Sequence, residues 1–282
     1  QYSSPVQIPG TTWNSVSVSY YGAVATKTDG TLWNWGHNNR GELGQNNVTP
    51  HKSPVQVPGT TWSFAMGGFV RHLGLKTDGT LWGWGENGMG QLGQNNKTHY
   101  SSPVQIPGTT WTNKFHSGYS AVAAVKSDGT LWTWGNGNLG KLGQNTPANV
   151  DRSSPTQVPG TTWDTVESNG QTGSMYARKT DGTAWTWGAN NYGDLGQNNT
   201  TDYSSPVQIP GTTWSQMRVG HRGGGGRKTD GTLWLWGWNQ SGGLGQNNTT
   251  QYSSPIQVPG TEWTNMVSLN QGWGLFQDDQ TP

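Results

Sequence analysis

Residues 76 to 93 read K-T-D-G-T-L-W-G-W-G-E-N-G-M-G-Q-L-G, and this stretch decides the fold. Its Asp-Gly pair predicts a two-residue hairpin turn, because both residues tolerate the positive φ angles that such a turn needs. The L-W-G-W-G segment then places Trp82 and Trp84 two residues apart, on one face of a β-strand. The stretch therefore predicts a turn that feeds a strand whose tryptophans pack together.

Copies of this pattern recur along the chain. The Asp-Gly turn returns at Asp29, Asp78, Asp128, Asp181 and Asp230. A P-G step recurs at Gly10, Gly59, Gly108, Gly160, Gly211 and Gly260, with spacings of 49, 49, 52, 51 and 49 residues. A regular period of this size indicates a repeat architecture. The units are about 1–51, 52–100, 101–152, 153–202, 203–252 and 253–282.

Each unit reads as four short strands. A T-T-W strand such as Trp13 to Val18 is followed by a second strand such as Ala23 to Thr28, then by the L-W-x-W-G strand and a P-V-Q strand. Tandem units of this kind predict an all-β fold, a single β-propeller domain of about six blades over residues 1–282, closed into a ring. The sixth unit has no L-W-x-W-G strand, so the last blade is expected to be incomplete. We expect Gln1 to Ile8 to pair with it, with Gln277 to Pro282 at the junction.

Composition agrees with this reading and narrows the function. The chain has 44 Gly, 18 Trp and no Cys, and only 29% hydrophobic residues, so tryptophan must supply much of the buried surface. The net charge of +1, without a basic cluster, predicts no nucleic-acid partner. No apolar stretch is long enough for membrane insertion. The six histidines share no ligand spacing, and no nucleophile motif occurs, so we expect no metal, no cofactor and no enzymatic activity. Gly223 to Gly226 is expected to form a flexible loop rather than a phosphate cradle.

The stretch from 76 to 93 resembles the repeat of the regulator of chromosome condensation family, which carries a D-G turn, an aromatic-x-W-G strand and a G-Q-L-G segment. The resemblance covers essentially the whole chain and implies a β-propeller, commonly of seven blades. The family pattern places a histidine seven residues before the turn aspartate. Here those positions hold Gly22, Arg71, Ala121, Ser174, Gly223 and Gly272, so any role of the family histidines does not carry over.

Candidate binding residues lie where the near-identical copies disagree. The first variable region, between the T-T-W strand and the strand before the turn, contains Tyr20, Tyr21, Phe69, Arg71, His72, Tyr119, Tyr176, His221, Arg222 and Trp273. The second follows W-G; it contains Trp238 and one equivalent position occupied by Arg40, Met89, Leu139, Tyr192 and Ser241. Drift in tolerant loops explains such variation equally well. Enrichment in aromatic residues and arginine favours recognition, because these residues dominate interface hot spots.

These features predict a binding or scaffold propeller, with a protein partner or self-assembly. The Asn- and Gln-rich connectors favour an extracellular, cell-surface or virion location. The alternative is a lectin-like propeller that binds glycans through exposed aromatic side chains. Guanine-nucleotide exchange or chromatin binding, which the family resemblance suggests, fits less well, because the chain has no basic tail and lacks the family histidines.

Overall fold

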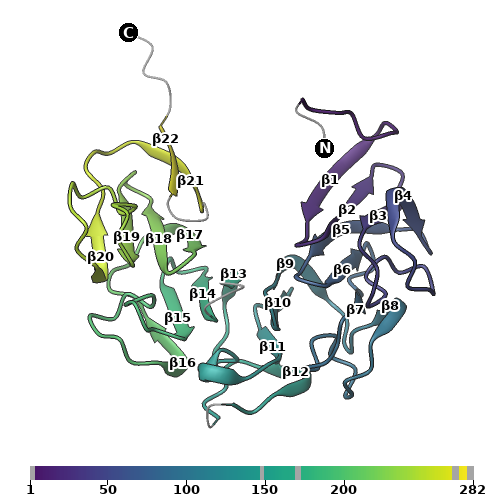
Figure 1. The fold of residues 1–282 in the computed structure, drawn as a ribbon. Helices are drawn as coiled ribbons and strands as arrows, with labels where there is room; N and C mark the ends of the chain where they lie inside the picture. Colours follow the sequence, from purple (N-terminus) through teal and green to yellow (C-terminus); the bar gives the residue numbers. More distant parts are fainter. Residues whose placement is uncertain (1–3, 147–148, 169–172, 269–272, 278–282) are drawn as a thin grey trace. The chain divides into compact units, whose positions relative to one another are not determined.

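The computed structural model describes residues 4–146, 149–168, 173–268 and 273–277 (Figure 1). The chain forms two compact units, Gln1–Asn113 with Ser153–Pro155 and Lys114–Arg152 with Thr156–Pro282, and each is described by itself. The described residues contain no α-helix and one short 3-10 segment, η1 (Asn138–Gly140). The expected all-β fold is therefore confirmed.

The strands form five four-stranded antiparallel sheets and one two-stranded sheet. Blade 1 contains β1 (Trp13–Val18), β2 (Gly22–Lys27), β3 (Leu32–Gly36) and β4 (His51–Val57). Blade 2 contains β5 (Trp62–Gly67), β6 (Arg71–Lys76), β7 (Leu81–Gly85) and β8 (Tyr100–Gln105). Blade 3 contains β9 (Trp111–Ser117), β10 (Ala121–Lys126), β11 (Leu131–Gly135) and β12 (Arg152–Gln157). Blade 4 contains β13 (Trp163–Ser168), β14 (Ser174–Lys179), β15 (Ala184–Gly188) and β16 (Tyr203–Gln208). Blade 5 contains β17 (Trp214–Gly220), β18 (Gly223–Lys228), β19 (Leu233–Gly237) and β20 (Tyr252–Gln257), and blade 6 contains β21 (Trp263–Ser268) and β22 (Trp273–Gln277).

Sequence order is kept within every sheet, and the sixth sheet has two strands. The propeller of about six blades with an incomplete last blade is thus confirmed. Closure into a ring and the single domain over 1–282 stay predictions. So does the pairing of Gln1 to Ile8 with the sixth unit, because residues 1–3 and 278–282 lie outside the described residues.

The Asp-Gly turn differs in detail from the two-residue turn expected from the sequence. In blade 1 only Gly30 has a positive φ, of 78°, and Asp29 does not. The Gly30 N–H donates to the Lys27 carbonyl at 3.1 Å, and the Lys27 N–H donates to the Thr31 carbonyl at 2.9 Å. This is a three-residue loop with glycine at the left-handed position. Asp29 instead accepts hydrogen bonds from the Thr31 N–H (2.9 Å) and hydroxyl (2.6 Å), which lower the pKa of its carboxyl group.

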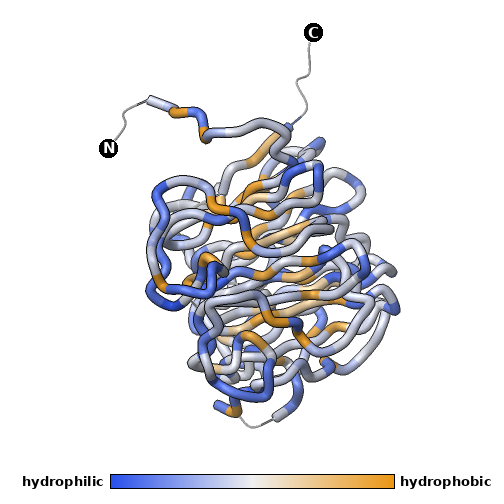
Figure 2. Tube along the Cα trace, turned by 90° about the vertical axis from the view of Figure 1, so that its right-hand side faces the viewer, coloured by the Kyte–Doolittle hydropathy of each residue, from blue (hydrophilic) through white to orange (hydrophobic). Residues whose placement is uncertain are grey.

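Neighbouring blades pack on one another through two tryptophans, the second one of L-W-x-W-G and the one that begins the T-T-W strand. In the N-terminal unit, Trp62, Ala65 and Trp84 of blade 2 form one buried cluster with three residues of blade 1. In the C-terminal unit, the corresponding residues of blade 5 pack in the same way against blade 4. Hydrophobic residues recur along the strands, and hydrophilic ones dominate many connectors (Figure 2). The core is therefore a series of junctions between neighbouring blades rather than one central cluster.

One hydrogen bond repeats at these junctions. The Trp84 indole Nε1–H donates to the Glu42 carbonyl at 2.9 Å, the Trp187 indole to the Lys141 carbonyl at 2.9 Å, and the Trp236 indole to the Asp194 carbonyl at 2.8 Å. We call these three acceptors the receiving carbonyls. Each lies in the loop after W-G of the preceding blade. The loop that varies between blades is thus anchored to the next blade by its backbone.

The first tryptophan of L-W-x-W-G has a different role. The Trp33 indole donates to the Thr31 hydroxyl at 2.9 Å, and the Lys27 ammonium lies 4.5 Å from the centre of the Trp33 ring. The same lysine lies 4.8 Å from the Trp13 ring. A lysine held over two aromatic faces gains cation–π attraction. The repeat thereby keeps its turn, lysine and tryptophans in one arrangement.

The four-glycine segment is a strand, and the expectation of a flexible loop there is wrong. Gly223 to Gly226 begin β18 and are buried. A Cβ on Gly224 would lie 2.4 Å from the Tyr176 ring and 2.6 Å from the Trp236 ring. Glycine is required here because aromatic side chains of two blades occupy the space on that side of the strand.

The second residue of each T-T-W or T-E-W step holds an uncommon backbone conformation. Thr61 and Thr213 have φ values of 67° and 66°, in the left-handed region, where a β-branched residue is strained. The Thr61 carbonyl accepts a hydrogen bond from the Thr77 N–H at 2.9 Å, and the Thr213 carbonyl accepts one from the Thr229 N–H at 2.9 Å. This strained conformation directs the carbonyl toward the neighbouring strand of the same blade, and the hydrogen bond formed there offsets the strain.

Candidate functional site

Two of the candidate residues form an exposed aromatic cluster with a third in the N-terminal unit. Tyr20 and Tyr21 follow β1 and are 65% and 53% exposed, while Phe69 follows β5 and is half-buried. The Tyr20 ring centre lies 4.5 Å from that of Tyr21 and 4.7 Å from that of Phe69. Tyr20 and Phe69 occupy equivalent positions of consecutive blades. We call Tyr20, Tyr21 and Phe69 the aromatic cluster.

Charged groups border the aromatic cluster. His37 lies 5.1 Å from Tyr21 between ring centres, and its Nδ1 hydrogen-bonds the Glu42 carboxylate at 2.6 Å. The second Glu42 oxygen accepts the Arg40 backbone N–H at 2.7 Å. The Arg40 side chain is exposed. Exposed aromatic rings thus lie next to a partly exposed histidine that a buried glutamate holds in place, a combination suited to contact with a partner surface that is both polar and apolar.

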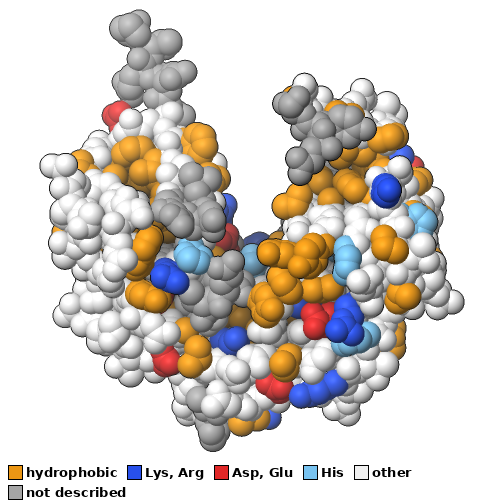
Figure 3. Space-filling view, viewed as in Figure 1, with side chains coloured by type: hydrophobic (Ala, Val, Ile, Leu, Met, Phe, Trp, Pro, Cys, Tyr) orange, Lys and Arg blue, Asp and Glu red, His pale blue; other side chains and the backbone are white. Residues whose placement is uncertain are grey.

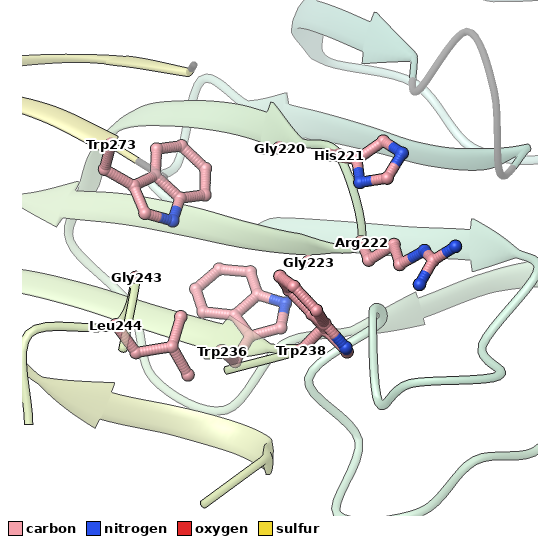
Figure 4. Close-up of a pocket in the computed structure, with 9 residues that line it drawn as sticks. All are labelled: Gly220, His221, Arg222, Gly223, Trp236, Trp238, Gly243, Leu244 and Trp273. Carbon is pink, nitrogen blue, oxygen red and sulfur yellow. The ribbon is translucent and has the colours of Figure 1, made fainter. Parts of the chain in front are cut away.

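A second cluster lies in the C-terminal unit. The Arg222 guanidinium lies 4.7 Å from the Tyr192 ring centre and 5.8 Å from the Trp238 ring centre. The side chain is half-buried, and among the described residues its guanidinium donates no hydrogen bond. Arg222 and Trp238 line a pocket of about 20 Å³, together with His221, Trp236, Trp273 and Leu244 (Figure 4). We call Tyr192, Arg222 and Trp238 the arginine stack.

Figure 4 shows how blade 5 and blade 6 build this pocket. His221 and Arg222 lie on the turn between β17 and β18, Trp238 directly follows β19, and Trp273 begins β22. The Trp238 N–H donates to the Arg222 carbonyl at 2.8 Å, which holds the two side chains beside one another. A volume of about 20 Å³ is enough for one water or a small polar group and not for a cofactor.

Asp194 lies beside the arginine stack, and reasoning from the sequence did not single it out. Its side chain is 1% exposed, one oxygen accepts the Tyr192 N–H at 3.0 Å, and the other has no hydrogen-bond partner. Burial raises the pKa of this carboxyl to about 6, against the opposing effect of the Tyr192 N–H and Arg222. The signal available in the sequence was its position, because the equivalent residues are Glu42, Gln91, Lys141 and Gly243.

Three candidates expected in variable loops lie in strands and are buried. Arg71 and His72 belong to β6 and Tyr176 belongs to β14, with exposures of 0%, 1% and 0%. The His72 Nδ1–H donates to the Glu42 receiving carbonyl at 2.6 Å, and burial lowers the pKa of this histidine to about 4. The Tyr176 hydroxyl donates to the Asp194 receiving carbonyl. These residues support the loops from beneath rather than facing a partner.

Three further candidates are exposed on the surface. Met89, Tyr119 and Leu139 are 43%, 50% and 38% exposed. Tyr119 lines a second, smaller pocket of about 10 Å³ in the C-terminal unit, beside Ser120, Lys141 and Ser168. The structure brings together the aromatic cluster and, separately, the arginine stack with His221 and Trp273.

The part of the chain that the structure describes holds no group of three or more His, Cys, Asp or Glu residues that could bind a metal ion. No helix among these residues is long and apolar enough to cross a membrane. The two clusters offer aromatic ring faces, a half-buried arginine and one pocket of about 20 Å³ for contact with a partner.

Blades of this sequence pattern, linked in tandem, define a repeat propeller that fits a binding or scaffold module. The regulator of chromosome condensation (RCC1) repeat matches residues 29–66, 78–125, 128–166, 181–223 and 230–274. The chain therefore belongs to the regulator of chromosome condensation repeat family.

Solved structures of the same fold agree. The chain is similar to human WBSCR16, with 21% identity, a TM-score of 0.77, and coverage of 95% of this chain and 72% of that chain. It is also similar to Prp20p of Saccharomyces cerevisiae, described for its binding to Gsp1p and histones, with 16% identity, a TM-score of 0.77, and coverage of 94% and 69%. Yeast RCC1 (Prp20) bound to Kap60 gives 15% identity, a TM-score of 0.77, and coverage of 94% and 67%. No curated protein matches this chain in sequence.

Proposed function

We propose that this chain is a protein-recognition module that binds a partner through the loops carrying the aromatic cluster and the arginine stack. The observation that carries the proposal is the aromatic cluster. Two tyrosines that are more than half exposed contact each other and a neighbouring half-buried phenylalanine through their rings. Exposed aromatic groups of this kind are typical of protein contact sites, because each ring buries a large area at little entropic cost.

The arginine stack supports the same function in the other unit. The Arg222 guanidinium lies 4.7 Å from the Tyr192 ring centre and 5.8 Å from the Trp238 ring centre, and these contacts restrict its orientation before a partner arrives. Preorganised arginine and aromatic side chains are the residues most enriched at interface hot spots. Arg222 is thus suited to an acceptor group on a partner protein, such as a carboxylate or a backbone carbonyl.

The similar structures support a protein partner at the level of the fold. Prp20p is described with Gsp1p and histones, and yeast RCC1 is seen with Kap60. The loops differ, since identity is 15–16%. We therefore expect the partner to be a protein that recognises the loop residues of this chain and not those of the similar structures. Non-enzymatic action and an extracellular, cell-surface or virion location belong to this proposal and rest on the sequence alone.

Photo-crosslinking of the full chain tests the proposal. Benzoylphenylalanine in place of Tyr20 is irradiated in extract and medium of the source organism, and crosslinked partners are identified and purified. We expect the triple variant Tyr20→Ser, Tyr21→Ser, Phe69→Ser to raise the Kd for the purified partner by about 30-fold or more, which corresponds to the loss of ~2 kcal/mol of hot-spot contact.

The matched control is Val48→Ser. It alters a loop side chain that is 57% exposed, comparable to the two tyrosines, and that belongs to neither cluster. The control variant should bind the partner as tightly as the original chain does. All variants should have the melting temperature of the original chain. Equal binding by the triple variant would contradict the role of the aromatic cluster. Saturable binding to a glycan array without any crosslinked protein would favour the lectin-like alternative.

A further inference from the structure

Lys141 differs from every other lysine of the chain in its surroundings. Lys114 forms an ion pair with Asp164, and Lys52 and Lys97 are exposed. Lys141 is half-buried, and it makes no ion pair and lies over no aromatic ring among the described residues. Charged side chains are few on the surface drawn in Figure 3, in agreement with their share of 11% of the chain. The remaining lysines lie 4.4–4.7 Å from the ring centre of the first tryptophan of L-W-x-W-G; they are Lys27, Lys76, Lys126, Lys179 and Lys228.

The position of Lys141 in the repeat makes a lysine unexpected there. In blades 1, 2 and 4 the equivalent side chain accepts the N–H of the residue two places earlier, at 2.7–3.0 Å; these side chains are Glu42, Gln91 and Asp194. A lysine side chain has no acceptor and cannot hold its loop in this way. The loop of blade 3 instead contains η1, in which Leu139 has a positive φ of 60°. Lys141 therefore does not do for its loop what the equivalent residues do for theirs.

The Lys141 side chain lines the small pocket of about 10 Å³ in the C-terminal unit. Its ammonium donates to the Ser120 hydroxyl at 3.4 Å, longer than the usual ~2.7–3.2 Å. This is the one hydrogen bond that the ammonium makes with a described residue. The Ser168 hydroxyl in the same pocket is already bonded to the His116 Nδ1 at 2.6 Å. The stem of the lysine packs on Gly173, where a Cβ would lie 3.2 Å from the Lys141 Cε.

This environment favours the uncharged amine. Burial lowers the pKa of the Lys141 ammonium, against the opposing attraction of Asp151. Asp151 makes its hydrogen bonds elsewhere, since its Oδ1 accepts the Asn136 Nδ2–H and the Gly137 N–H, both at 3.2 Å. A larger fraction of Lys141 is therefore free amine at neutral pH than of an ordinary lysine, and the free amine is the nucleophile. The amine also has a fixed root, because the Lys141 carbonyl accepts the Trp187 indole N–H at 2.9 Å.

We propose that Lys141 is a modification site whose amine takes an acetyl group from an acetyl thioester. The nitrogen lone pair attacks the carbonyl carbon of the thioester, so that a C–N bond forms and the C–S bond breaks. The thiolate leaves and takes up the proton that the nitrogen loses. The products are an N-acetylated lysine and a free thiol.

The pocket selects the acetyl group by size and by charge. A volume of about 10 Å³ admits a group of about the size of one water and not a long or aromatic acyl chain. The amide that forms carries no charge, so acetylation removes the cost of keeping an ammonium half-buried. The amide N–H remains a donor for the Ser120 hydroxyl that the ammonium contacts now.

The test measures acetylation lysine by lysine in the full chain. The protein is incubated with the small thioester N,S-diacetylcysteamine, and the rate at each lysine is followed by peptide mass spectrometry. At pH 7 we expect Lys141 to react at least about threefold faster than the exposed Lys52. This ratio should fall as the pH is raised to about 10, where an ordinary lysine also loses its proton. With the S-benzoyl ester of the same thiol, Lys141 should lose its lead because the ring does not fit the pocket.

Two variants connect the rate to the pocket. Ser120→Asp places a carboxylate beside the amine, favours the ammonium and should slow acetylation of Lys141 at pH 7 at least about fivefold relative to Lys52. Ser241→Asp, at an exposed loop serine of blade 5, should leave the rate unchanged. Reaction at Lys141 no faster than at Lys52 at pH 7 overturns the proposal. So does an unchanged rate in Ser120→Asp, or an equal lead with the benzoyl ester.

Stability gives a readout that does not depend on the thioester. Lys141→Gln should leave the urea midpoint at pH 7 unchanged or raise it, because the glutamine of blade 2 at this position accepts an N–H of its own loop. The acetylated chain should likewise unfold at the same or a higher urea concentration than the original chain. A lower midpoint in either case would show that the charged lysine serves the fold, and it would overturn the proposal.

Discussion

Replacing Asp194 by asparagine should stabilise the protein near neutral pH. Burial raises the pKa of this carboxyl from 3.8 to about 6, so the ionised form is penalised in the folded state. At about 1.4 kcal/mol per pKa unit, the penalty at pH 7 is about 3 kcal/mol. Asparagine keeps an acceptor for the Tyr192 N–H and carries no charge. We therefore expect the variant to gain up to about 3 kcal/mol in unfolding free energy at pH 7.

The pH dependence separates this effect from a general gain in packing. A group whose folded pKa is raised contributes stability below its unfolded value, and this contribution is lost as pH rises through the folded value. The gain of Asp194→Asn should therefore vanish near pH 4 and reach its full size above pH 6. Urea unfolding at pH 4, 5, 6 and 7 measures it.

The matched control is Glu42→Gln at the equivalent position of blade 1. Both Glu42 oxygens have donors, the His37 Nδ1–H and the Arg40 N–H, so the substitution removes favourable contacts and should not stabilise. A loss of stability in Asp194→Asn at pH 7, or an equal gain at pH 4 and pH 7, would refute the reasoning.

Three further predictions concern stability. Trp84→Ala should cost about 3–5 kcal/mol in urea unfolding, because it opens a cavity in the fully buried junction of blades 1 and 2. Trp35→Ala, which removes a half-buried ring, should cost less than half of that, and equal costs would contradict the junction argument. Gly224→Ala should lower the unfolding free energy by about 1–3 kcal/mol, because the new Cβ overlaps the Tyr176 and Trp236 rings. The control Gly88→Ala, whose Cβ would meet only His99 at 3.9 Å, should leave the melting temperature nearly unchanged. Thr213→Asn should raise stability by about 0.5–1 kcal/mol, since asparagine tolerates the left-handed region better than threonine; a lower urea midpoint would count against strain at this position.

The fold was predictable because local pattern and tertiary packing agree in every repeat. The strands from Trp13 and from Leu32 follow from alternation, and the period of the P-G steps gives the number of blades. Two details did not follow. The turn at Asp29 depends on hydrogen bonds to Thr31, which the Asp-Gly pair alone does not specify. The glycines of β18 look flexible in sequence, and only the aromatic rings of neighbouring blades explain them.

The candidate site was predictable only in part. Variation between repeats selected Tyr20, Phe69 and Arg222, which are exposed or half-buried, and it also selected Arg71 and Tyr176, which are buried; a binding role of the exposed residues stays a prediction. A position varies between repeats when its surroundings differ from blade to blade. The side chain at such a position can face solvent or pack against another blade, so variation alone does not show exposure. Asp194 was missed because its raised pKa results from burial, and the local sequence pattern does not show which loop side chains are buried.

The central claim is that blades 2, 4 and 5 each dock on the preceding blade by a tryptophan indole that donates to a receiving carbonyl. Hydrogen exchange of the indole N–H groups in the ¹⁵N-labelled full chain tests it most directly. The account predicts slow exchange for Trp84, Trp187 and Trp236, whose indoles are bonded at 2.8–2.9 Å. It predicts faster exchange for Trp35, a half-buried residue whose indole N–H donates to no acceptor among the described residues. Fast exchange at the three bonded indoles, or equally slow exchange at Trp35, would contradict it.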